Sequence, residues 1–146
     1  MTKEGTMAIQ KVAEQILREN GIDPANGDFY LKLQKPGYDD LVIEKNGLQV
    51  FVGHYFEQSG DRVPDPVLVM DYNGGSWYPE RIEQVLGETT VSFMENEKRM
   101  VYPKRVKEFK SFQAMFARNI KEQGWLDVKP QMTVSSGKYP DEKEAV

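Results

Sequence analysis

The chain has 146 residues, a formal net charge of −4, no cysteine and a single histidine. This length suits one domain, and the lack of cysteine excludes a disulfide framework, thiolate chemistry and cysteine zinc sites. No apolar run resembles a signal peptide or is long enough to span a membrane, so we expect a cytoplasmic protein. The acidic balance argues against nucleic-acid binding by the whole surface, but it does not exclude a local basic patch.

The first predicted element is a helix that Thr6 caps and that runs to about Asn20. Gly21 is well placed to end it, because glycine readily adopts the left-handed conformation found after helices. One face of this helix is apolar at helical spacing, through Ile9, Val12, Ala13, Ile16 and Leu17.

Four strands are predicted next, over residues 28–34, 39–46, 48–57 and 66–72. Their connections are short, which indicates antiparallel neighbours. Asn46-Gly47 predicts a two-residue hairpin turn. Glycine, aspartate and prolines predict a long loop over residues 58–65.

The pattern of residues 76–86 fits either a strand or a short helix. Residues 88–94 alternate as a strand, and residues 98–102 are its expected partner. Pro103 is favourable in the first turn of a second helix, which should run to Gln123. We therefore predict one domain over residues 6–127, followed by a largely flexible tail over residues 128–146 that is polar from Thr133 onwards.

These elements predict an α+β fold. We expect a curved antiparallel sheet of five or six strands, packed with an N-terminal helix and a long C-terminal helix.

His54 lies in the third predicted strand and has two interpretations. With Glu57 and Asp61 nearby in the sequence, it could serve as a base or a metal ligand. A lone histidine without cysteine or a second histidine is a poor basis for such a site, so a half-buried structural histidine is favoured. An acid–base or metal-assisted enzyme centred on these residues is the least favoured functional hypothesis.

One face of the second predicted helix carries positive charges without negative ones. At about 100° per residue, Lys107, Lys110, Arg118 and Lys121 fall within a sector of about 80° opposite the apolar stripe. Lys104 adds to the positive charge at the start of the helix. Such a face could follow a phosphate backbone or meet an acidic protein surface, although an ordinary solvated helix face is the favoured interpretation.

Motifs that mark common chemistries do not occur. The chain has no P-loop, no dinucleotide-binding glycine motif, no H-E-x-x-H and no G-x-S-x-G. We therefore expect no cofactor and no enzymatic activity.

Several short motifs carry a resemblance to a family. They are Phe56-Glu57-Gln58 before Gly60-Asp61, the Asp65-Pro66 step with the apolar strand after it, Trp77-Tyr78-Pro79, Gly87, and the helix end from Ala117 to Trp125. Together they resemble an uncharacterised domain family found in phage, plasmid and conjugative-element proteins, sometimes as one module of polyvalent or antirestriction-type proteins. The resemblance implies a mobile-element origin and an antiparallel α+β domain, and it implies no activity.

The sequence thus predicts a small non-enzymatic binding protein that engages a protein or nucleoprotein partner. The expected contact residues are the basic helix face and the loop over residues 58–65. The alternative is direct nucleic-acid binding through the basic helix face.

Overall fold

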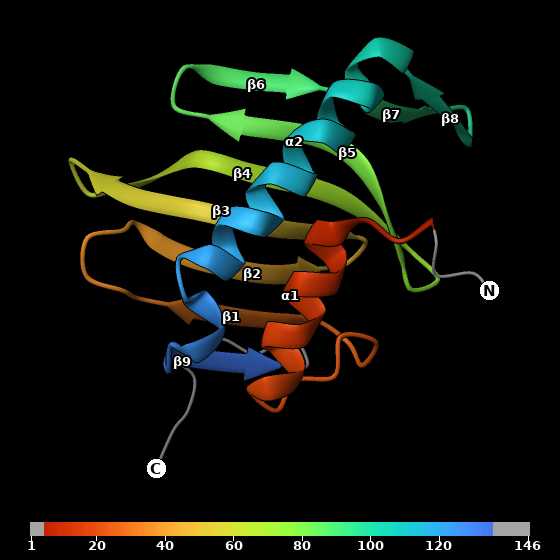
Figure 1. The fold of residues 1–146 in the computed structure, drawn as a ribbon. Coiled ribbons are helices and arrows are strands. Elements are labelled where there is room, and N and C mark those ends of the chain that lie inside the picture. The colour runs from red at the N-terminus through yellow and green to blue at the C-terminus, as the bar shows by residue number, and fades with distance from the viewer. Residues whose placement is uncertain (1–4, 136–146) are drawn as a thin grey trace.

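The computed structural model describes residues 5–135, in which an antiparallel sheet carries helices on one side (Figure 1). The helices are α1 (Ala8–Glu19), α2 (Pro103–Glu122) and a one-turn 3₁₀ helix, η2 (Trp125–Asp127). The strands, in chain order, are β1 (Phe29–Leu33), β2 (Asp40–Asn46), β3 (Gln49–Gln58), β4 (Asp61–Asn73), β5 (Ser76–Gln84), β6 (Gly87–Thr90), β7 (Ser92–Glu95), β8 (Lys98–Val101) and β9 (Pro130–Ser135).

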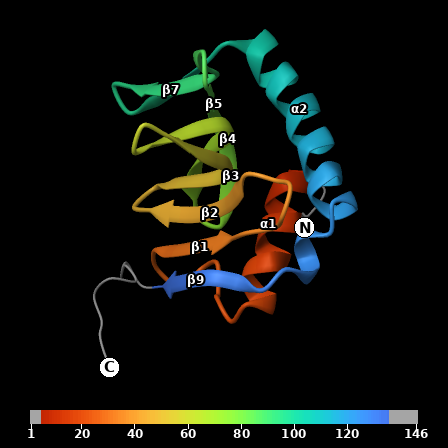
Figure 2. The same cartoon turned by 90° about the vertical axis from the view of Figure 1, so that its left-hand side faces the viewer.

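The main sheet of the described residues has seven strands in the order β6-β5-β4-β3-β2-β1-β9. Each neighbouring pair is antiparallel, and β7 and β8 form a separate hairpin. Both α1 and α2 lie on the same face of the sheet (Figure 2). The predicted α+β class is therefore confirmed, with seven strands in place of five or six.

Strand β9 is the additional strand, and it lies in the segment for which the sequence predicts a flexible tail. It pairs antiparallel with β1 from Phe29↔Ser135 to Leu33↔Pro130. Pairing satisfies backbone N–H and C=O groups along the edge of β1, a driving force that polar composition does not reveal. The rest of the expected tail, residues 136–146, lies outside the described residues.

The prediction of a long loop over residues 58–65 is wrong. β3 and β4 continue as a paired hairpin to Gln58↔Asp61, with only Ser59 and Gly60 between them. Pro64 is accommodated because this end of β4 pairs with β3 alone, whereas pairing with β5 begins at Val67. The ambiguous residues 76–86 supply strand β5 and the turn after it.

Helix α1 begins without the predicted Thr6 cap. Its N-cap residue is Met7, and no side chain of the cap bonds to the first turn. The side chain of Gln113, from α2, instead accepts a hydrogen bond of 2.8 Å from the backbone N–H of Ile9. A contact between the two helices therefore satisfies a donor at the helix start that a local cap normally satisfies.

One core lies between the sheet and the two helices. Its largest fully buried side chains include Trp125, Phe109, Ile9, Ile16, Leu17, Leu31, Leu33, Leu41, Ile43, Leu68, Met70 and Ile120. Within residues 5–135, no helix combines the length and apolar character that crossing a membrane requires.

Gly53 is the point of closest approach between β3 and β4. A Cβ at this position would collide with the carbonyl oxygen of Pro66 and the Cα of Val67. The pairing register between β3 and β4 also shifts between Gly53 and Tyr55. Only glycine therefore fits at this point of close approach between the paired strands β3 and β4.

We expect Gly53→Ala to lower the free energy of unfolding by about 3 kcal/mol or more, because the clashing atoms belong to backbone. Gly5→Ala is the matched control, since no atom lies within 4 Å of its Cβ position and its φ is not in the left-handed region. Urea unfolding, followed by circular dichroism, measures the free energy of unfolding of both variants. Equal stabilities of the two variants would contradict the close approach.

Candidate functional site

Helix α2 presents the predicted basic side chains on its outward side. The buried residues of the helix are Phe109, Gln113, Phe116, Ala117 and Ile120. The basic face, as we call it, consists of five exposed cations: Lys104, Lys107, Lys110, Arg118 and Lys121. At 1.5 Å per residue the basic face extends about 26 Å along the helix axis. The structure thus brings together all five residues that the sequence singles out on this helix.

Among residues 5–135, none of the five cations of the basic face forms an ion pair with an acid. Arg105, on the same helix, differs, because it donates a 2.9 Å hydrogen bond to the carbonyl oxygen of Thr90. Its guanidinium also lies 4.2 Å from the centre of the Tyr102 ring. Arg105 therefore links α2 to the end of β6, whereas the charges of the basic face remain available to a partner.

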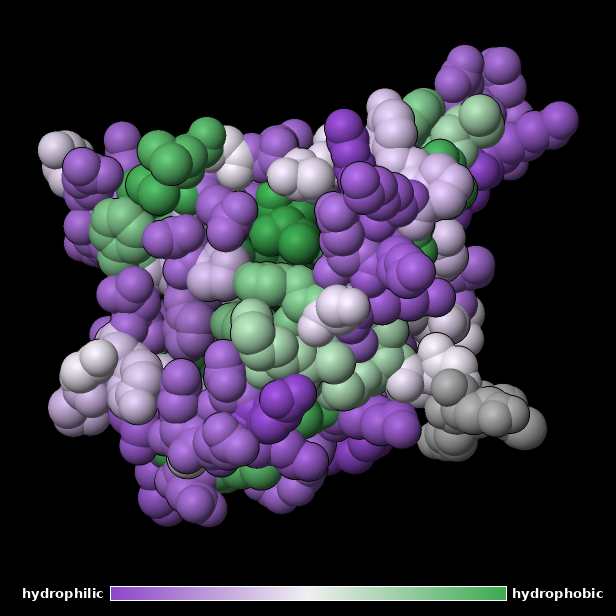
Figure 3. Space-filling model, turned by 45° about the horizontal axis from the view of Figure 1, so that its top comes forward, coloured by the Kyte–Doolittle hydropathy of each residue, from purple (hydrophilic) through white to green (hydrophobic). Residues whose placement is uncertain are grey.

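An apolar groove lies between α2 and the β5–β6 hairpin, with a volume of about 270 Å³. Its apolar lining consists of Ile82, Val91, Phe109 and Phe112, and its polar lining consists of Gln84, Thr89, Arg105 and Glu108. Figure 3 shows a hydrophobic area among hydrophilic side chains on this side of the molecule. Phe112 is only half-buried, and Met115 is 43% exposed.

Phe112 and Met115 occur at helical spacing with the buried residues of α2, so the pattern assigns them to the core and does not predict the groove. The apolar stripe of α2 is wider than the surface that the sheet and α1 cover, and its margin lines the groove. An unusually wide stripe is the one sequence signal that could indicate this surface.

His54 is a packing residue on the helix side of the sheet. Its Nδ1 lies 3.0 Å from the carbonyl oxygen of Asp39. The centre of its ring is 5.6 Å from the ring centre of Phe116 and 5.6 Å from that of Trp125. These contacts tie β3 to α2 and η2.

The structure does not bring His54 together with Glu57 and Asp61. Glu57 lines a hollow with Tyr55 and Arg62 on the face of the sheet away from the helices. Asp61 lies at the exposed end of the β3–β4 hairpin. In the part of the chain that the structure describes, no group of three or more histidine, aspartate or glutamate side chains is arranged to hold a metal ion.

The sheet face away from the helices carries charges that are paired with each other. Arg81 forms ion pairs of 2.7 Å with Glu80 and 2.9 Å with Glu83. Arg99 pairs with Asp71 at 2.6 Å. Because its cations are engaged by its own acids, this face offers less free charge than the basic face. The sequence could not reveal these pairs, since they depend on strand register.

Three groups on this sheet face have perturbed pKa values. Burial raises the pKa of the Tyr55 phenol to about 12. Burial is also the main cause that raises the pKa of Glu44, and Arg62 partly opposes it. Burial likewise raises the pKa of Glu80, while a hydrogen bond from Gln49 opposes it. Such perturbation occurs at functional sites and in structural networks alike, and here the neighbouring ion pairs favour a structural network.

We expect Glu44→Gln to raise the Tm at pH 7. The folded-state pKa of Glu44 lies above its ordinary value of 4.5, so the stability that its protonation gives is present below pH 4.5 and lost as pH rises through the folded-state pKa. The gain from the variant should therefore shrink as pH falls towards 4. Thermal unfolding at both pH values, with the exposed Glu57→Gln as control, measures this. A lower Tm of Glu44→Gln at pH 7 would contradict it.

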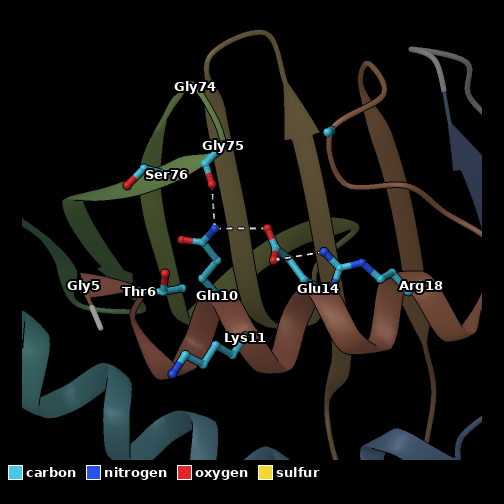
Figure 4. A pocket seen from close by; sticks show the side chains of 10 residues that line it. Gly5, Thr6, Gln10, Lys11, Glu14, Arg18, Gly74, Gly75 and Ser76 are labelled. Atoms are coloured by element: carbon cyan, nitrogen blue, oxygen red, sulfur yellow. Dashed lines mark hydrogen bonds and ion pairs between the residues drawn. The ribbon is translucent and has the colours of Figure 1, made fainter. Parts of the chain in front are cut away.

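A wide hollow of about 1180 Å³ lies where α1 faces the turn between β4 and β5 (Figure 4). Gln10, only 5% exposed, donates hydrogen bonds of 2.8 Å to the carbonyl oxygen of Gly75 and 3.1 Å to Glu14. Its side-chain oxygen accepts a bond of 3.2 Å from the backbone N–H of Trp77. Gln10 therefore uses its polar atoms to hold the β4–β5 turn against α1.

Replacing Gln10 with leucine should lower the free energy of unfolding by about 1–3 kcal/mol, because the backbone groups of Gly75 and Trp77 lose their partner. Gln15→Leu is the control, since Gln15 is exposed and its side chain donates one hydrogen bond of 3.3 Å within the described residues, to Glu19. It should change stability by no more than about 0.5 kcal/mol. If chemical denaturation finds the two variants equally stable, Gln10 does not have this role.

Comparison with known proteins identifies a family. A family model described as a domain of unknown function (DUF6908) matches residues 9–126, which include α2 and the strands from β1 to β8. No curated protein and no solved structure matches the chain.

Proposed function

We propose that this chain, which belongs to the DUF6908 family of domains of unknown function, is a non-enzymatic binding protein. It engages an acidic surface of a protein or nucleoprotein partner through the basic face of α2. The observation that carries this proposal is the absence of ion pairs at five exposed cations on one side of the helix, within residues 5–135.

Electrostatics supports a docking role for this face. The chain is acidic as a whole, with a net charge of −4, so the positive potential is local to α2. A local patch of one sign steers a partner of the opposite sign and fixes its orientation. A solvated face without a partner needs no such segregation, since mixed charges keep a surface soluble.

We also propose the kind of genetic element and the cell compartment in which the protein acts. Its sequence resemblance to proteins of phages, plasmids and conjugative elements supports an accessory role for a bacterial mobile element, in the cytoplasm of the host. The partner would then be a protein or nucleoprotein complex of the host or of the element.

Direct nucleic-acid binding is the second candidate. The spacing of the cations favours it, since five of them follow about 26 Å of a single helix, a length over which a nucleic-acid strand presents several phosphates. Such binding would weaken steeply with salt, because it releases condensed counterions.

We expect the triple variant Lys107→Glu, Lys110→Glu and Lys121→Glu to weaken binding of an oligo-glutamate peptide about tenfold or more, because it reverses three charges of the basic face. The control changes three exposed lysines outside α2, Lys11, Lys98 and Lys129, to glutamate and has the same net charge. Fluorescence anisotropy at about 50 mM salt measures both.

The outcomes separate the two candidates. Loss of binding in the triple variant alone supports docking through the basic face, whereas equal loss in both variants overturns it. The same titrations with double-stranded DNA, from about 50 to 200 mM salt, test the second candidate. Tighter binding of DNA than of the peptide would favour direct nucleic-acid binding. The slope of the logarithm of the DNA-binding constant against the logarithm of the salt concentration should then be smaller in magnitude by about 2 to 3 in the triple variant.

A further inference from the structure

The exposed surface of α2 carries the basic face on one side and, next to it, a mixed side on which Glu108 lies between the apolar residues Met115 and Phe112. The basic face occupies one side, centred near Lys107 and Arg118. At about 100° per residue, Met115 lies about 60° further round the helix than Arg118, and Phe112 about 60° beyond Met115. Phe112 lines the apolar groove. A partner that rests on the basic face thus meets Met115, then Glu108 at the edge of the groove, and then the apolar side chains of the groove.

The groove is large enough to receive side chains. Its volume of about 270 Å³ exceeds the roughly 150 Å³ of an apolar cavity that admits a benzene ring. Ile82, Val91 and Phe112 form apolar parts of its lining, and Arg105 and Glu108 add a charge of each sign. Buried apolar anchors beside a charged rim are the usual anatomy of a protein–protein interface.

We propose that the partner which α2 engages is an acidic amphipathic helix of another protein. Its large apolar side chains enter the groove between α2 and the β5–β6 hairpin, and its acids meet Lys107 and Arg118. This inference rests on the proposed function, to which it adds the class of partner. It favours a protein over a nucleic acid, because a phosphate backbone has no group that would gain from the groove.

A helix fits this surface better than an extended strand. β6, at the edge of the sheet, has only four residues, and the carbonyl oxygen of Thr90 at its end already accepts a bond from Arg105. Short, partly covered edges disfavour the addition of a strand. A helix with anchors at positions i, i+3/i+4 and i+7 places apolar groups along one line, as the margin of α2 requires.

The test compares three probes on the full chain by fluorescence anisotropy. The first is an acidic peptide of about 20 residues, long enough to form a helix, with leucines at i, i+3/i+4 and i+7 and glutamates elsewhere. The second has the same composition in an order that spreads the leucines around the helix. The third is an oligo-glutamate of equal charge. The amphipathic peptide should bind about tenfold more tightly than either of the others.

Two uncharged variants, called the groove variants, probe the groove and the exposed side of α2 next to it. Met115→Gln removes an exposed apolar contact, and Thr89→Trp places a large ring over the groove from an exposed rim position on β6. Each should lower the affinity for the amphipathic peptide about tenfold and change the affinity for the oligo-glutamate less than about twofold. Circular dichroism checks that both variants are folded, and two substitutions on different elements guard against a local distortion.

The outcomes distinguish this inference from the proposed function. If the three probes bind equally and the groove variants change nothing, the amphipathic partner is excluded while docking through the basic face stands. If reversing Lys107, Lys110 and Lys121 leaves every probe bound, the proposed function fails and this inference fails with it. Tighter binding of a DNA duplex than of any peptide, unchanged by the groove variants, also overturns the inference.

Discussion

The packing of α2 across one face of the sheet is the interaction on which the rest of the molecule depends. Phe109 and Ile120 are buried in the core under this helix, and Gln113 reaches from it to the backbone of Ile9 at the start of α1. The same packing fixes which sides of α2 remain exposed. The basic face and the apolar groove are thus consequences of how this helix satisfies the core.

Two charged surfaces of the protein differ in how their charges are used. On the uncovered sheet face, Arg81 and Arg99 are held by acids at 2.6 to 2.9 Å, and burial perturbs pKa values there. Those interactions are internal, so they stabilise strand register and leave little for a partner. On α2 the five cations of the basic face are exposed and form no ion pair within residues 5–135. This contrast, rather than the amount of charge, points to α2 as the docking surface.

The sequence predicted what depends on local periodicity and failed where distant segments meet. Helical spacing located both helices and the basic face. Asn46-Gly47 located the β2–β3 hairpin one residue too early, because Asn46 pairs with Gln49 and the turn residues are Gly47 and Leu48. Composition misread residues 58–65 as a loop, because a proline such as Pro64 is tolerated on a strand with one neighbour. It also missed β9, whose pairing with β1 joins residues about a hundred positions apart. The sequence does not predict the groove, because its walls come from two distant segments, α2 and the β5–β6 hairpin.

The most direct test of docking through α2 is to locate a bound acidic ligand on the protein. Amide resonances of the isotope-labelled full chain would be followed by NMR during titration with oligo-glutamate at low salt. We expect the largest shifts at Lys107, Ser111 and Arg118 on the outward side of α2, and small shifts on the uncovered sheet face. Shifts centred on that sheet face, or spread evenly over exposed lysines such as Lys11 and Lys98, would contradict a docking surface on α2.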